Sequence, residues 1–264
     1  MSIRGRIKLA WWGIWVGLVA VALYAASKLD ASSILFLVPV VVVSLAAKKK
    51  VTTLVVRGAF RRLGRLAEAG KFDKAHALLA EIHPFYVGSK ANIEWLRVQE
   101  SSILLRESRY FEAATLLESV DRTALRPGWV PFLLNNLAWS LAHTDRAARA
   151  VLVARESMEA STTAGDQPVT TEDLRGYQLG TLGTSLTLAG QHEEAIPLLE
   201  QALARGGRPT AQAARAFYLG EALQGLGRHA DARTAWKRAS DADAKNEFAR
   251  RARARLTEPV PAYR

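Results

Sequence analysis

Residues 190–195 read GQHEEA, and a related stretch at residues 227–232 reads GRHADA, 37 residues further on. In both copies a leucine-rich segment with helical periodicity precedes the glycine. Alignment on the final alanine finds five copies at intervals of 38, 37, 45 and 37 residues: Ala75, Ala113, Ala150, Ala195 and Ala232. Repetition at this period is typical of a solenoid in which each unit buries its apolar face against its neighbours.

A second position repeats twelve residues before each alanine, and it is small in four of the five copies: Leu63, Ser101, Ala138, Gly183 and Gly220. The pattern resembles the tetratricopeptide repeat, a helix-turn-helix of about 34 residues. The fourth copy places these residues at the family's repeat positions: Leu179, Leu182, Gly183, Leu186, Ala195, Leu199 and Ala202. The fifth copy matches with these: Leu219, Gly220, Leu223, Ala232, Trp236 and Ala239.

The resemblance implies an all-α fold with an α-solenoid of about five helix-turn-helix repeats over residues 56–246. A Thr-, Gly- and Asp-rich loop at residues 161–172 explains the 45-residue interval. We expect a capping helix at residues 247–256 and a disordered tail at residues 257–264, because terminal repeats need a polar outer cover. Proteins of this family bind peptides or proteins, so the resemblance implies a scaffold rather than an enzyme.

Two uncharged apolar runs, residues 9–26 and 31–47, precede the repeats and are separated by a turn at 27–30. Each approaches the length of a membrane-spanning helix, which predicts a two-helix transmembrane hairpin. Its basic flanks, residues 1–8 and 48–65, place both ends and the repeats in the cytoplasm. We therefore expect a bacterial inner-membrane protein, similar in layout to HemY-type envelope proteins. A cleaved signal peptide and a monotopic hairpin remain alternatives.

The net charge of +11 is concentrated at the N-terminal end, because residues 1–65 contain eleven Lys or Arg and one acid. Such a cluster attracts anionic lipid headgroups. The residues expected to contact lipid are Lys48, Lys49, Lys50, Arg57, Arg61, Arg62 and Arg65. A second basic cluster at residues 245–255 fits either a solvated cap or a site for an acidic partner. Nucleic acid is the less favoured partner for both clusters.

No catalytic or cofactor site is predicted. The chain has no cysteine and five histidines, and no metal-ligand spacing accompanies those histidines. The glycines at 176, 180 and 183 lie within a predicted helix and follow no strand, so they do not fit a dinucleotide-binding turn. The sequence contains no nucleophile with an associated base. We expect no cofactor, no metal and no enzymatic activity.

In the family, the first helices of successive repeats line a groove for a peptide. The corresponding positions here are Trp95, Val98, Ser102, Phe132, Asn135, Trp139, Tyr177, Gly180, Thr184, Phe217 and Glu221. Aromatic anchors beside polar groups suit peptide recognition. The leading hypothesis is a membrane-anchored scaffold for a protein or peptide partner, with self-association left open. The alternative is a lipid-associated structural or self-assembling membrane protein in which the basic hairpin segment is the functional part.

Overall fold

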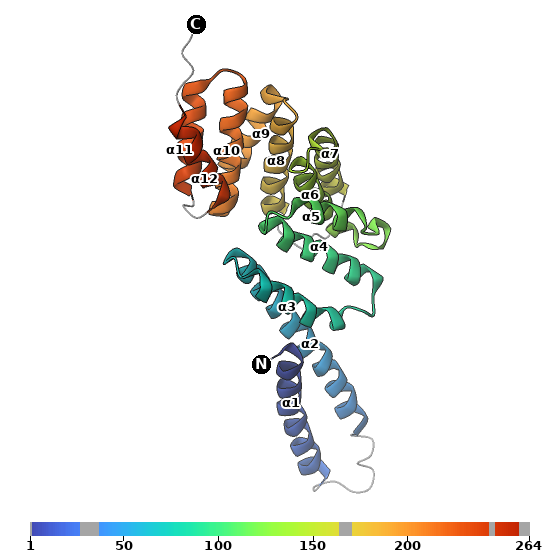
Figure 1. The fold of residues 1–264 in the computed structure, drawn as a ribbon. Coiled ribbons are helices and arrows are strands. Elements are labelled where there is room, and N and C mark those ends of the chain that lie inside the picture. The colour runs from blue at the N-terminus through green and yellow to red at the C-terminus, as the bar shows by residue number, and fades with distance from the viewer. Residues whose placement is uncertain (1, 27–36, 164–170, 243–245, 259–264) are drawn as a thin grey trace. The chain divides into compact units, whose positions relative to one another are not determined.

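The computed structural model describes residues 2–26, 37–163, 171–242 and 246–258. Within these residues the chain forms twelve α-helices and three short 3-10 turns, with no strand (Figure 1). The all-α prediction is confirmed. The chain divides into two compact units, unit 1 at residues 1–89 and unit 2 at residues 90–264.

Unit 1 contains α1 (Ile3–Ala26), α2 (Leu37–Glu68), α3 (Phe72–Ile82) and a 3-10 turn, η2 (His83–Phe85). The start of α1 is held by α3, because the backbone N–H of Ile3 donates to Glu81 Oε2 at 3.0 Å. The negative carboxylate at the N-terminal end of α1 also interacts favourably with the positive pole of the helix dipole. Leu63 of α2 is buried, so the first copy of the repeat tolerates leucine where the others have a smaller residue.

The prediction of an integral membrane protein is wrong. In the part of the chain that the structure describes, no helix has both the length and the apolar character required to cross a bilayer. Both helices of the expected hairpin include their basic flanks: α1 starts at Ile3, before Arg4 and Arg6, and α2 runs without a break to Glu68. The first apolar run, and the described part of the second from Leu37 onward, are therefore parts of longer helices that also carry charged residues. The expected turn at 27–30 lies outside the described residues.

Unit 2 contains four helix pairs and a final helix (Figure 1). The pairs are α4 (Lys90–Arg106) with α5 (Tyr110–Glu118), α6 (Val130–Ala142) with α7 (Ala147–Thr163), α8 (Thr171–Leu188) with α9 (His192–Ala204), and α10 (Pro209–Gly225) with α11 (His229–Ala242). The turns η3 (Arg122–Ala124) and η4 (Pro127–Trp129) connect α5 to α6, and α12 (Glu247–Thr257) ends the unit. Most of the expected loop at 161–172 and of the expected tail at 257–264 lies outside the described residues.

The five predicted turns share one backbone conformation. The residue five before each repeat alanine has a positive φ: Gly70 at 66°, Ser108 at 60°, Asp145 at 57°, Gly190 at 78° and Gly227 at 72°. The next N–H donates to a carbonyl five residues back, as from Gln191 to Leu186 at 2.9 Å. This left-handed helix end favours glycine. Two copies adopt it with Ser or Asp, so the turn is kept where the glycine is absent.

Glycine allows the two helices of the last repeats to approach closely. A Cβ added at Gly183 would lie 2.6 Å from Leu199 Cγ, and one added at Gly220 would lie 2.3 Å from Trp236 Nε1. Leu199 and Trp236 are the large residues of the second helices, and both are buried. The small position therefore opens the space that the large position fills, as the repeat pattern predicts.

Candidate functional site

Three aromatic side chains form what we call the first aromatic cluster: Trp95 on α4, Trp129 on η4 and Phe132 on α6. The rings of Trp95 and Trp129 are stacked with centroids 4.7 Å apart, and Phe132 meets Trp95 edge-on at 6.0 Å. The guanidinium of Arg126 lies 4.7 Å from the centroid of the Trp129 ring. All three aromatic residues are half-buried, so each keeps some accessible surface. The cluster is an aromatic surface supported by helices.

The second aromatic cluster joins elements that are far apart in sequence: Tyr110, Trp139, His143, Phe217, Tyr218 and Phe248. Tyr110 at the start of α5 stacks on His143 at 4.4 Å. Trp139 of α6 meets Tyr218 of α10 edge-on at 6.3 Å. Edge-to-face and stacked pairs of this kind add stability beyond the area that they bury.

His143 is the polar centre of the second aromatic cluster. Its Nδ1 lies 2.8 Å from the carbonyl oxygen of Trp139, and its Nε2 lies 2.8 Å from the hydroxyl of Tyr218. A carbonyl can only accept, so Nδ1 carries the proton and Nε2 accepts from the Tyr218 hydroxyl. Burial lowers the pKa of His143 to about 4, and burial raises the pKa of Tyr218. Both groups are therefore neutral near pH 7.

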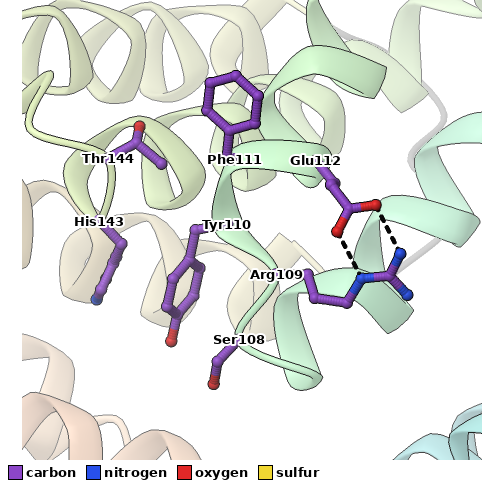
Figure 2. Close-up of a pocket in the computed structure, with 7 residues that line it drawn as sticks. All are labelled: Ser108, Arg109, Tyr110, Phe111, Glu112, His143 and Thr144. Carbon is purple, nitrogen blue, oxygen red and sulfur yellow. Dashed lines mark hydrogen bonds and ion pairs between the residues drawn. The ribbon is translucent and has the colours of Figure 1, made fainter.

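A shallow pocket of about 320 Å³ lies beside this cluster. It is lined by Ser108, Arg109, Tyr110, Phe111, Glu112, His143 and Thr144 (Figure 2). Figure 2 shows Arg109 turned toward Glu112, and its Nε and Nη2 donate to the two carboxylate oxygens at 2.7 and 2.6 Å. The charged groups on this side are thus paired with each other. Phe111 is 70% exposed, so the pocket offers aromatic surface rather than reactive groups.

The structure separates the groove candidates. Trp95 and Phe132 belong to the first aromatic cluster and are half-buried, as is Asn135. Trp139 and Phe217 pack in the second aromatic cluster, where Phe217 is buried and Trp139 is half-buried. The side chains of Val98 and Thr184 are also buried.

Three further candidates have partners within unit 2. The hydroxyl of Ser102 accepts from Asn136 Nδ2 at 3.0 Å. Glu221 accepts from Arg255 of α12 at 2.9 and 2.8 Å. Tyr177, which is 37% exposed, lies against the guanidinium of Arg215. The structure therefore brings Trp95 together with Phe132, and Trp139 together with Phe217, but does not join all candidates in one surface.

Arg215 is a residue that the sequence pattern did not indicate. It is only 5% exposed, and its Nη1 donates to the carbonyls of Ala202 and Gly206 at 2.9 and 2.6 Å. These carbonyls end α9, so the cation meets the negative pole of that helix. A Cβ at Gly180 would lie 2.9 Å from Arg215 Nε, which explains the glycine at this groove position. The only sequence signal was an apolar stretch interrupted by one arginine.

The lipid candidates lie on α2 of unit 1. Lys50, Arg57, Arg61, Arg62 and Arg65 are all exposed, while the side chains of Lys48 and Lys49 are outside the described residues. The exposed face is basic, as expected. Lipid contact and self-association stay predictions, because nothing in the structure tests them.

A comparison with protein families matches residues 177–208 to the tetratricopeptide repeat. The match covers α8 and α9, the pair that carries Gly183, Gly190 and Ala195. Over this pair of helices the chain is similar to the tetratricopeptide-repeat family. The comparisons do not confirm the likeness in layout to HemY-type proteins.

One solved structure has a similar fold, and a second is less similar. One is PlcR from Bacillus thuringiensis in complex with the peptide PapR7 and DNA, with 14% identity, TM-score 0.60, and coverage of 77% of this chain and 74% of that chain. Another is a putative kinesin light chain with TPR-like repeats from Podosopora anserina, with 19% identity, TM-score 0.49, and coverage of 72% and 95%. No protein of curated function matched the sequence significantly.

Proposed function

We propose that unit 2 binds a peptide segment of a protein partner and that the first aromatic cluster anchors this segment. The observation that carries the proposal is the half-exposed stack of Trp95 on Trp129, with Phe132 against its edge. Large rings held by a rigid scaffold bury area on binding with little loss of side-chain entropy. The fold likeness to PlcR, whose structure contains a bound peptide, supports this class of function.

The chemistry of the cluster favours an apolar or aromatic side chain of the peptide. Such a side chain would cover the exposed parts of Trp95 and Phe132, while Arg126 beside Trp129 is placed for a carboxylate or carbonyl of the peptide. Arg126 already lies against the ring of Trp129, so its positive charge disfavours a second cation there. The function proposed is recognition and scaffolding, without a chemical step.

The test is selection of peptides from a random display library on the full chain, followed by measurement of Kd by fluorescence anisotropy. Selected peptides should lose at least about tenfold in affinity for Trp95→Ala and Phe132→Ala variants, because truncation of an aromatic hot spot costs about 2 kcal/mol or more and about 1.4 kcal/mol is tenfold. Phe111→Ala is the matched control, since it removes an exposed ring outside the cluster. Equal losses in all three variants, or no enrichment of peptides, would contradict the proposal.

A further inference from the structure

Helix α12 does more than cover the last repeat. Ala249 and Ala252 are fully buried, as a cap requires. Phe248, however, reaches beyond α10 and α11 to α6, where its ring lies 6.0 Å from that of Trp139. The helix therefore contacts two first helices that are not neighbours in sequence, and it occupies groove positions that the repeat pattern assigns to a ligand.

Three side chains of α12 make these contacts with spacing i, i+3 and i+7, which places them on one face of a helix. Phe248 is 7% exposed and lies 5.6 Å from Tyr218 and 6.0 Å from Phe217. The guanidinium of Arg251 lies 4.4 Å from the Phe217 ring centroid. Arg255 makes two hydrogen bonds to the carboxylate of Glu221. The receiving surface thus provides one aromatic site for Phe, ring faces for one Arg and a carboxylate for the other.

The ends of α12 are also held. The hydroxyl of Ser108, in the turn between α4 and α5, donates to Glu247 Oε2 at 2.9 Å. At the other end, Arg233 Nη2 donates to the carbonyl of Leu256 at 3.0 Å. These contacts resemble those of a helical ligand in a groove, in which anchors along one face set the register and polar contacts hold the ends.

We propose that α12 is the resident ligand of this face, and that the face recognises in a partner an amphipathic helix of the same chemistry, with Phe followed by Arg three and seven residues later. The proposal rests on the proposed function of unit 2 as a peptide-binding module and assigns it a second, self-occupied site. Attachment in the same chain gives α12 a high effective concentration, so the partner helix binds well only when α12 is weakened or displaced.

The test uses a fluorescent peptide with the sequence of residues 246–258 and full-length chains. A Phe248→Ala chain should bind the peptide at least about tenfold more tightly than the natural chain, because its own α12 competes poorly. A peptide with the Phe248→Ala change should bind neither chain. The Arg250→Ala peptide is the matched control, since Arg250 is exposed, and it should bind as well as the unchanged peptide.

A charge exchange tests the register. In the Phe248→Ala chain, Glu221→Arg should weaken binding of the unchanged peptide, and a peptide with Arg255→Glu should restore it. If the Phe248→Ala chain does not fold, a chain with Arg251→Ala and Arg255→Ala loosens α12 while keeping the buried ring. Equal binding of the peptide to natural and loosened chains, or no restoration by the exchanged charge, would overturn the proposal.

The two proposals can be rejected independently of each other. Loss of α12-peptide binding, with library peptides still sensitive to Trp95→Ala, would reject only the resident-ligand proposal. Retained α12-peptide binding, with no library peptide sensitive to Trp95→Ala, would reject only the first aromatic cluster as an anchor.

Discussion

Replacement of Gly220 by alanine tests whether the small position of the repeat is required for the approach of α10 to α11. A Cβ at this position would lie 2.3 Å from Nε1 and 2.4 Å from Cδ1 of Trp236. Nonbonded carbon atoms are normally about 3.5 to 4.0 Å apart, so the buried indole must move by more than about 1 Å. Overpacking of this kind costs about 1 to 3 kcal/mol. Alanine gains about 0.8 to 1 kcal/mol over glycine in a helix interior, so we expect a net loss of up to about 2 kcal/mol.

The assay is urea unfolding followed by circular dichroism, with a double-mutant cycle on Trp236→Ala. Truncation of the indole removes the clash, so Gly220→Ala should be neutral or stabilising in the Trp236→Ala background. Gly58→Ala is a further control, because a Cβ there meets nothing within 4 Å and should not destabilise unit 1. If Gly220→Ala lowered stability equally in both backgrounds, the contact between Gly220 and Trp236 would not be the cause.

Two further predictions concern a turn and a buried histidine. Asp145→Gly should raise the free energy of unfolding by up to about 1 kcal/mol, because Asp145 has a left-handed φ of 57°, which glycine adopts more easily. Asp145→Val should lower the free energy of unfolding in the same urea titration. A higher free energy of unfolding with valine would contradict the reasoning. Burial lowers the pKa of His143 to about 4, so the unfolded chain takes up a proton first as the pH falls. The free energy of unfolding should therefore fall by up to about 3 kcal/mol between about pH 6.5 and pH 4. His143→Gln should remove this part of the pH dependence, and an unchanged slope in that variant would show that His143 is not its source.

The helix pairs and their turns could be predicted because they depend on local contacts. Residues that close a turn or line a helix pair lie within one repeat, and the spacing of Gly190 to Ala195 already encodes them. Two of the three residues of the first aromatic cluster could be predicted, because Trp95 and Phe132 occupy equivalent repeat positions. Trp129 could not be predicted, because it lies in an irregular connection with no equivalent in the other repeats. Arg215 was missed, because its partners are carbonyls at the end of α9 and carry no side-chain pattern.

The membrane prediction was wrong because it rested on two apolar runs taken separately from their flanks. In the structure α2 continues without interruption from Leu37 to Glu68, so the basic segment and the apolar run belong to one helix. Whether one helix continues from an apolar segment into a basic segment depends on its tertiary contacts. Here α1 begins against Glu81 of α3, a contact across 78 residues that sequence periodicity cannot reveal.

The sequence by itself determined the repeat period, the all-α fold and the places of the turns, because these follow from hydrophobic periodicity. The left-handed backbone of Ser108 and Asp145 became visible only in the structure, because neither residue type requires it. Only the tertiary structure decided which aromatic residues meet. Trp139 and Phe217 are groove candidates like Trp95 and Phe132, but Phe248 of α12 packs against Trp139 and Phe217. Phe217 is buried, whereas Trp139 stays half-buried like Trp95 and Phe132. These contacts join α6, α10 and α12, which are far apart in the sequence, so hydrophobic periodicity cannot reveal them.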